Sequence, residues 1–318
     1  MQKRELGKSG ITVAPITFGG NVFGWTIDEK KSFEILDAFT AAGFDFIDTA
    51  DVYSHWVPGN HGGESETIIG NWVKLRGNRD KIIIATKVGA GNNNHGRNLT
   101  KKYILQTVEE SLKRLQTDYI DLYQTHWDDD VTPVEETLDA YSVLIKAGKV
   151  RAIGASNLSP QRLYASLEAR KKFGLPRYET FQPLYNLYDR EPFEKELEAI
   201  TVANNISVIN YYSLASGFLT GKYRNEKDTQ TVASARAQGV KKYLNARGLS
   251  ILHALDKVSE KYNAELATVA LAWLLARPSV TAPIASATNT HQLSALVKAV
   301  DLILTKDDIA VLNEASAW

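Results

Sequence analysis

Four side chains of complementary chemistry stand at the ends of predicted strands. Asp48 ends the apolar run that starts at Phe44, and Tyr53 follows it after five positions. Lys87 and His126 end the next two β-rich runs along the chain. In a parallel barrel the carboxyl ends of all strands open on one face, where such barrels carry their active sites. We therefore expect these four residues to converge at that mouth.

The four residues suit the delivery of a proton to a carbonyl oxygen. A tyrosine titrates near pH ~10, so it is a poor acid unless its anion is stabilised. We expect the Lys87 ammonium to favour the phenolate of Tyr53 and so to lower its pKa. Asp48 would keep that lysine charged and in place, and a neutral His126 could hold the substrate oxygen. No activated serine is apparent and cysteine is absent, so a hydride from a reduced nicotinamide is the expected partner reagent.

Each of the four has an ordinary structural explanation when taken alone. Asp48 could form a turn or cap a helix, and Tyr53 could serve only for packing. Lys87 could be a solvated loop residue, and His126 a hydrogen-bonded core residue. The argument rests on their combination, because all of them follow consecutive β-runs of one alternating pattern.

Short β-rich runs alternate with amphipathic segments from end to end, which predicts a (β/α)8 TIM barrel. The expected strands are Pro15–Phe18, Phe44–Asp48, Ile82–Lys87, Ile120–Gln124, Ala152–Ala155, Glu179–Gln182, Ser207–Tyr211 and Thr281–Ile284. Helices are expected after Thr100 and after Ser159, each a capping residue. No linker composition divides the chain, so we interpret residues 1–318 as one domain.

Several segments depart from this alternation. Leu6–Val13 has the pattern of a hairpin that could plug the lower end of the barrel. The loops His55–Gly63 and Gly89–Asn98 are rich in Gly and Asn and would overhang the active face. Gly217–Leu244 is a long irregular stretch with few apolar anchors. A loop of that length in a compact domain is usually functional, and we expect it to become more ordered when cofactor binds.

The composition excludes several classes of function. The chain has 37 basic and 37 acidic residues and a net charge of zero, so it offers no general attraction to nucleic acid or to a membrane surface. The absence of cysteine excludes disulfides and thiolate catalysis. The segment Met1–Gly7 lacks the apolar run of a signal peptide. We expect a cytoplasmic protein that acts on a small molecule, with its oligomeric state left open.

Motifs along nearly the whole chain resemble those of the aldo-keto reductase family, in particular a bacterial branch similar to potassium-channel β-subunits. They are Phe46–Ala50 with Tyr53, Gly63–Gly70, Ile84–Lys87, Gln124–His126, Ile153–Asn157, Phe181–Pro183 and Tyr211–Tyr223. The resemblance implies NADPH-dependent reduction of aldehydes or ketones. By this resemblance Tyr53 is the general acid, and Lys87 and Asp48 adjust the pKa of Tyr53. His126 orients the substrate.

The resemblance also implies where the NADP cofactor binds. Ser156, Asn157 and Gln182 match residues that hydrogen-bond the nicotinamide carboxamide, and Tyr211 matches an aromatic that stacks on the ring. The remaining matched contacts, from the first strand, the pyrophosphate loop and the adenosine end, are Gly20, Asn21, Asp48, Ser213, Leu214, Ala215, Gly217, Lys222, Arg236, Ser286, Thr288 and Gln292.

This chain departs from the family pattern at the adenosine end. Ala295 and Leu296 stand where the family has an acid and an amide that read adenine, and Ser286 and Gln292 replace basic residues of some members. Arg236 could supply the charge for a 2′-phosphate, so NADPH is favoured over NADH. Tyr212-Ser213 also replaces the family's Ser-Pro, which changes the expected rigidity of that loop.

Two other functions remain open from the sequence. One is an NADP-binding regulatory or channel-associated subunit with little turnover, and the other is an aldolase or isomerase that uses Lys87 as a Schiff base. No metal site is expected, because His55, His61 and His95 lie in polar loops without a metal-binding spacing. The tryptophans Trp25, Trp56 and Trp127 follow the first, second and fourth strands, and they could line an apolar pocket.

Overall fold

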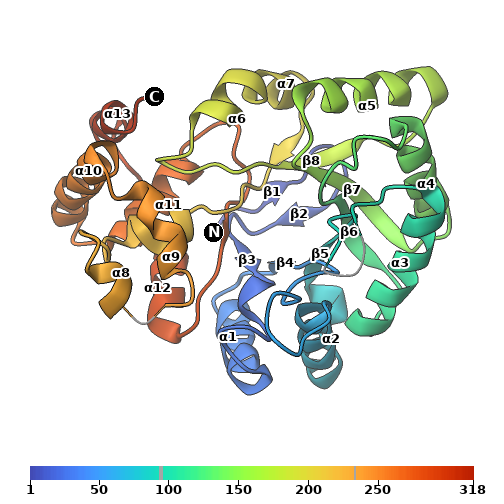
Figure 1. Cartoon of the computed structure of the whole chain (residues 1–318), viewed down its shortest axis with the longest axis horizontal. Coiled ribbons are helices and arrows are strands. Elements are labelled where there is room, and N and C mark those ends of the chain that lie inside the picture. Colours follow the sequence, from blue (N-terminus) through green and yellow to red (C-terminus); the bar gives the residue numbers. More distant parts are fainter. Residues whose placement is uncertain (93–95, 233) are drawn as a thin grey trace.

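The computed structural model describes residues 1–92, 96–232 and 234–318, so His95 lies outside the described residues. Parallel strands form one sheet in the order β10-β3-β4-β5-β6-β7-β8-β9, and helices surround it (Figure 1). The strands of this sheet are β3 (Thr17–Gly19), β4 (Phe46–Asp48), β5 (Ile83–Val88), β6 (Ile120–Thr125), β7 (Val150–Ser156), β8 (Tyr178–Gln182), β9 (Ser207–Val208) and β10 (Ile284–Ala285).

The sheet closes through its two edge strands, β9 and β10. Val208 forms a parallel bridge with Val280, and its carbonyl accepts a hydrogen bond from the Thr281 N–H (2.8 Å). Further along, the Ile284 N–H donates to the Asn210 carbonyl (2.9 Å). These contacts join the last strand to the one before it, which confirms the predicted (β/α)8 barrel.

Every predicted β-run overlaps a strand, and the largest differences lie at the seam. The run Ser207–Tyr211 contains a strand of two residues, and Thr281–Ile284 meets only the first residue of β10. Pro283 lies in this second run and has no N–H to donate to a ladder, so regular pairing starts only after it.

The helices form the outer layer of the barrel (Figure 1). They are α1 (Glu29–Ala41), α2 (Glu64–Arg76), α3 (Lys101–Leu115), α4 (Val134–Lys146), α5 (Pro160–Phe173), α6 (Glu191–Glu196), α7 (Glu198–Ala203), α8 (Asp228–Thr231), α9 (Ala237–Val240), α10 (Ala246–Tyr262), α11 (Leu266–Leu275), α12 (Thr290–Lys298) and α13 (Lys306–Ala315), with 3₁₀ turns η1 (Gly20–Val22), η2 (Arg79–Lys81), η3 (Ala215–Thr220) and η4 (Lys241–Tyr243). Within the described ranges, none of these helices is both long and apolar enough to cross a membrane.

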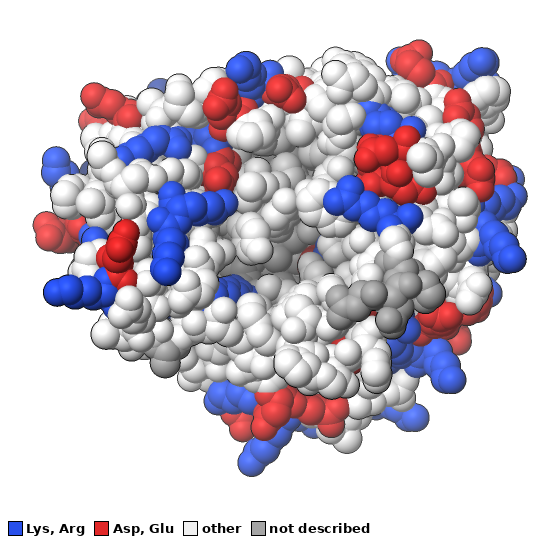
Figure 2. All heavy atoms as spheres, viewed as in Figure 1, with Lys and Arg blue, Asp and Glu red and all other residues white. Residues whose placement is uncertain are grey.

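The two predicted helix starts are confirmed by their caps. The Thr100 side chain accepts a hydrogen bond from the Tyr103 N–H at the start of α3, and the Ser159 side chain caps α5 at the Arg162 N–H. Each cap satisfies a backbone donor that the first helical turn leaves without a partner. On the face seen in Figure 2, Lys and Arg alternate with Asp and Glu around the rim, as the balanced composition predicts.

The predicted hairpin plug is confirmed. Strands β1 (Arg4–Glu5) and β2 (Thr12–Val13) pair antiparallel, and the hairpin lies near the middle of the view in Figure 1. Its apolar side chains pack inside the barrel in one buried cluster. The cluster consists of Leu6, Ile11 and Val13 from the hairpin and of Phe46, Ala85, Leu122, Ala152, Ile209 and Ala282 from the barrel wall.

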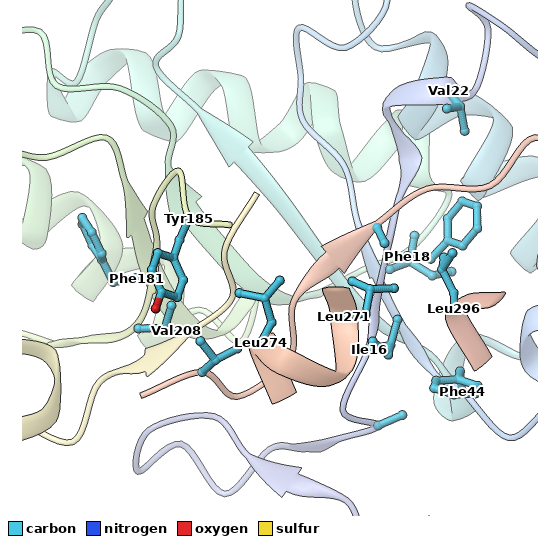
Figure 3. Close-up of a cluster of buried hydrophobic side chains, with 14 of the residues drawn as sticks. Ile16, Phe18, Val22, Phe44, Phe181, Tyr185, Val208, Leu271, Leu274 and Leu296 are labelled. Carbon is cyan, nitrogen blue, oxygen red and sulfur yellow. The ribbon is translucent and has the colours of Figure 1, made fainter. Parts of the chain in front are cut away.

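A second, larger core lies between the sheet and the helices. Helix α11 carries apolar residues all round and is buried among its neighbours, as expected for a helix inside a core. In Figure 3, Leu271 and Leu274 of this helix lie close to Ile16 and Val208 in the barrel wall. The segment Gly217–Leu244, expected to be irregular, instead contains the end of η3 and the short elements α8, α9 and η4.

The expectation that this segment has few apolar anchors was wrong. Phe218, Tyr223 and Tyr243 are fully buried, and the rings of Phe218 and Tyr243 stack with their centroids 5.4 Å apart. Each buried aromatic contributes a large apolar area to the core, so these side chains tie the segment to the barrel.

Candidate active site

The barrel interior becomes polar above the hairpin. Side chains two positions apart on a strand point the same way. On β4, β5 and β6 each inward apolar residue of the lower cluster is therefore followed by an inward polar residue, and Gln182 joins this upper level from β8. We call the lower set, Phe46, Ala85, Leu122 and Ala152, the apolar layer. We call the upper set, Asp48, Lys87, Gln124 and Gln182, the polar layer. Every side chain of the polar layer is buried.

Lys87 connects the predicted catalytic residues. Its ammonium donates to Asp48 Oδ2 (2.6 Å), to Tyr53 Oη (2.7 Å) and to the Thr49 carbonyl (2.8 Å). An ammonium has three donors, so this buried cation is fully hydrogen-bonded. The structure thus brings together three of the four residues that the sequence indicated.

The pKa of Tyr53 differs from the sequence prediction. Burial and the nearby Asp48 carboxylate raise the pKa of Tyr53 well above that of a free phenol. The Lys87 ammonium was expected to lower it, but the cost of burying a phenolate outweighs that attraction. Burial also lowers the pKa of Lys87, while Asp48 opposes that shift. Tyr53 therefore holds its proton at neutral pH.

His126 completes the set as a neutral imidazole. Burial, with the positive charge of Lys87, lowers the pKa of His126 well below its usual value. Its ring lies edge to face with the ring of Tyr53, with centroids 6.0 Å apart. Its Nδ1 is buried and has no hydrogen-bond partner within the described part of the chain. A neutral imidazole next to the phenol can hydrogen-bond an oxygen placed between them, as the sequence predicted.

Gln124 anchors Asp48, and the sequence analysis did not single it out. Asp48 Oδ1 accepts from Gln124 Nε2 (3.1 Å) and from Gln182 Nε2 (2.9 Å), while Oδ2 faces Lys87. Gly154 leaves room for this arrangement, since a Cβ there would lie 2.1 Å from Thr180 Oγ1 and 3.1 Å from Gln124 Cγ. The sequence does contain a signal for this role, because a polar amide at Gln124 follows the apolar Leu122 by two positions and so faces the same side of the strand.

A cavity of about 1070 Å³ opens above the polar layer, and Figure 2 shows a hollow with largely uncharged walls near the centre of that face. Most of the expected cofactor residues line it: Asn21, Asp48, Ser156, Asn157, Gln182, Tyr211, Ser213, Leu214, Gly217, Lys222, Arg236, Ser286, Thr288 and Gln292. Gly20 and Ala215 do not, because both are turned into the wall, where a Cβ on Gly20 would meet Ser65 and Asp48.

The residues expected at the nicotinamide are already joined to one another. Tyr211 Oη donates to Asn157 Oδ1 (2.9 Å), and Asn157 Nδ2 donates to Ser156 Oγ (2.9 Å) and to the His126 carbonyl (3.0 Å). Ser156 Oγ donates to the Gln182 carbonyl (2.8 Å). The amide nitrogen of Gln182 donates to Asp48. The amide oxygen of Gln182 therefore remains available as an acceptor.

The loop after β9 has a strained backbone where it borders the cavity. Tyr212, Ala215 and Ser216 have φ angles of 54°, 48° and 58°, in the left-handed region, and Gly217 follows at 93°. Left-handed conformations in residues other than glycine cost energy and cluster at binding loops. Tyr212 is also 47% exposed although it is aromatic.

Two cations on the cavity wall lack an acidic partner. Among the described residues, no carboxylate acts on the charge of Lys222 or Arg236 or pairs with it. Burial lowers the pKa of Lys222, and the charge of Arg236 lowers it further. The hydrogen-bond network orients the Asn21 amide so that its nitrogen donates to Ser286 Oγ (2.8 Å) and its oxygen accepts from Arg236 (2.9 Å). Unpaired, partly buried cations of this kind suit an anionic ligand.

The far end of the cavity includes residues that the sequence analysis did not name. Glu265 and His291 line it next to the expected Thr288 and Gln292. His291 Nε2 lies 3.8 Å from Glu265 Oε1, and the Gln292 side chain accepts from the Thr288 N–H (2.9 Å). Ala295 and Leu296 also line the cavity, so this end presents apolar surface where the family's acid and amide would stand.

Comparison with known proteins assigns the chain to a family. The sequence profile of the Aldo/keto reductase family matches residues 15–317. Aldo-keto reductase YhdN of Bacillus subtilis (strain 168) is 35% identical over 98% of this chain and 93% of its own length. The probable voltage-gated potassium channel subunit beta of Arabidopsis thaliana is 32% identical, over 95% and 92%. L-glyceraldehyde 3-phosphate reductase of Escherichia coli (strain K12) is 29% identical, over 99% and 92%. The chain belongs to the aldo/keto reductase family, which supports oxidoreductase activity on carbonyl compounds.

Proposed function

We propose that the protein reduces aldehydes or ketones to alcohols with NADPH and that Tyr53 is the general acid. The observation that carries this proposal is the position of Lys87, whose ammonium bonds both Tyr53 and Asp48 at the base of the cavity. A protonated phenol beside a neutral His126 forms a site for a carbonyl oxygen. The phenol proton would pass to that oxygen as negative charge develops on it, and Lys87 would stabilise the phenolate left behind.

The cavity residues fit a nicotinamide dinucleotide. Lys222 and Arg236 have no acidic partner among the described residues and could meet phosphate groups, and Gln182 Oε1 is an acceptor for the carboxamide. When bound, the reduced nicotinamide supplies a hydride to the carbonyl carbon. The left-handed backbone around Ala215–Gly217 would surround the pyrophosphate. Arg236 is the group we propose for the 2′-phosphate, which would favour NADPH over NADH.

The test is a panel of aldehydes and ketones assayed through NADPH and NADH oxidation, with wild-type protein and Tyr53→Phe. We expect wild-type turnover with NADPH. We expect the variant to lose about 10²–10⁴-fold in kcat while it binds NADPH with nearly unchanged affinity, because Tyr53 makes no proposed cofactor contact. Turnover within threefold of wild type in the variant would reject Tyr53 as the acid.

A second function is supported by one of the relatives. The Arabidopsis thaliana protein is named as a probable channel subunit, so this chain could bind NADPH and act mainly as a regulatory partner. Tight NADPH binding combined with no reduction of any carbonyl in the panel would favour this alternative. The fully hydrogen-bonded Lys87 and the neutral His126 favour the enzyme, because binding alone does not require a proton donor at the base of the cavity.

A further inference from the structure

Trp25 and Trp56 form a wall of the cavity beside Tyr53. The two indole rings meet edge to face, with centroids 5.5 Å apart and planes at 86°. Trp56 in turn lies against the phenol ring of Tyr53, with centroids 6.1 Å apart. Both tryptophans line the cavity, and Trp56 is 41% exposed although its neighbours are packed on it. The largest apolar side chains at the site therefore stand next to the proposed proton donor.

An aromatic wall of this kind binds flat apolar groups. Exposed apolar surface gains about 25 cal/mol for each Å² that a ligand covers. Edge-to-face and offset contacts between rings add about 0.5–1.5 kcal/mol beyond the area term. Trp127 also lines the cavity, but the Arg97 guanidinium lies 4.5 Å from its ring centre and covers one face. The Arg236 guanidinium lies 5.3 Å from the ring centre of Trp25. Trp56, which contacts the Tyr53 ring directly, is therefore the main indole surface beside the proposed acid.

One of the cavity's charges lies against this wall, since the Arg236 guanidinium is 5.3 Å from the ring centre of Trp25. The charged side chains on the described part of its wall are Asp48, Lys222, Arg236 and Glu265. Asp48 is paired with Lys87, and Glu265 lies at the far end beside His291. Lys222 and Arg236 are the cations proposed for the cofactor phosphates, and once engaged they are not available to a charged substrate.

We propose that the Trp25–Trp56 wall binds an aryl group, so that the preferred substrates are uncharged aromatic aldehydes or ketones rather than phosphorylated sugars. This inference rests on the proposed function, since it places the carbonyl at Tyr53. It separates this chain from the relative named L-glyceraldehyde 3-phosphate reductase, whose named substrate carries a phosphate.

The test compares three aldehydes with NADPH: benzaldehyde, heptanal and glyceraldehyde 3-phosphate. It uses wild type, Trp25→Ala, Trp56→Ala and the control Trp318→Ala, whose indole is 52% exposed and donates to Glu194 outside the cavity. Wild type should prefer benzaldehyde in kcat/KM. We expect Trp56→Ala to lower kcat/KM for benzaldehyde by about tenfold or more, mainly through KM. The loss for heptanal should be smaller, because heptanal loses only the area term and not the ring–ring term. Trp25→Ala should act in the same direction, and the control should change neither.

A binding measurement keeps this inference separate from the proposed reaction. Benzyl alcohol titrated into the protein with NADP, followed by ligand-observed NMR, should bind wild type and Trp318→Ala but not Trp56→Ala, even if no carbonyl is reduced. Equal loss with all three aldehydes in Trp56→Ala would overturn the inference, because the wall would then only support Tyr53. A wild-type preference for the phosphorylated aldehyde, or benzyl alcohol binding that Trp56→Ala leaves unchanged, would also overturn it.

Discussion

The two layers of the barrel interior share the strands β4, β5 and β6 but differ in their chemistry. The apolar layer packs against the hairpin in a cluster without any charged side chain. The polar layer, one inward position higher, holds a lysine, an aspartate and two glutamines that are all buried. A displacement of two residues along β4, β5 and β6 therefore separates a core from a candidate active site.

The contrast indicates how a buried charge is made tolerable. Burying an unpaired charge costs several kcal/mol, so the polar layer has to satisfy each group. The Lys87 ammonium uses its three hydrogens, and both oxygens of Asp48 accept hydrogen bonds. The apolar layer and its hairpin close the barrel from below and hold these strands at fixed spacing. We infer that the lower layer supports stability and the upper layer supports chemistry, and four substitutions test this division.

The largest effect is expected at the centre of the polar layer. Lys87→Met should lower kcat/KM for a carbonyl substrate by about 10³-fold, because Tyr53 would lose the cation that stabilises its phenolate. The assay is NADPH oxidation, with folding checked by circular dichroism. Lys149→Met is the matched control, since Lys149 pairs with Glu109 on the surface. Activity of Lys87→Met within threefold of the control would remove Lys87 from the chemistry.

The next effect should fall on the apolar layer and on stability alone. Leu122→Ala creates a cavity beneath Gln124 and should lower the free energy of unfolding by about 2–5 kcal/mol. Urea denaturation measures the loss, and Leu75→Ala is the control because Leu75 is exposed. The KM for NADPH should not change. A fall in kcat without any loss of stability would contradict the division between layers.

A smaller effect is expected from the amide that anchors Asp48. Gln124→Met keeps the size of the side chain but removes its hydrogen bond to a carboxylate, which is worth about 1.5–3 kcal/mol. If Asp48 and Gln182 shift as a result, kcat should fall by about tenfold to a hundredfold, and the pH profile of kcat should move as well. Gln116→Met is the surface control, since its amide bonds only Asn71 outside the barrel. If the pH profile of Gln124→Met is unchanged, Gln124 contributes only to packing and does not position Asp48.

The smallest effect concerns a carboxyl beside the polar layer. Asp51 is buried near Glu66 and Lys87, and its Oδ1 has no hydrogen-bond partner in the residues that the structure describes. Burial and the Glu66 charge raise the pKa of Asp51 to about 8. Arg114, which partly offsets this shift, hydrogen-bonds to Glu66. An unfolded aspartate ionises near pH ~3.9, so raising the pH from about 4 to 8 favours the unfolded chain.

Asp51→Asn should relieve that pH-dependent cost. We expect the variant to gain at least about 2 °C in Tm over wild type at pH 8. The gain should be clearly smaller at pH 5, only about one pH unit above the pKa of an unfolded aspartate. The thermal melts are run beside Asp301→Asn, a substitution at an exposed position. An equal gain at both pH values would mean that Asp51 is ionised in the folded protein throughout this range.

Much of this protein follows from local patterns in its sequence. The alternation of β-runs and amphipathic segments gives the barrel, and Thr100 and Ser159 give two helix starts, because periodicity and caps depend on neighbouring residues. The same alternation places Asp48, Lys87 and His126 at strand ends on one face. The hairpin plug also follows from a short local segment.

The tertiary structure decided what these residues experience. Asp48 and Gln182 are 134 positions apart, and their hydrogen bond exists only because the barrel curves them together. The burial that raises the pKa of Tyr53, against the sequence expectation, comes from the whole surrounding wall. The contact of Arg236 with Asn21 and the meeting of Trp25 with Trp56 likewise join separate loops. Desolvation and contacts between distant segments depend on closure of the fold, which no local pattern of residues specifies.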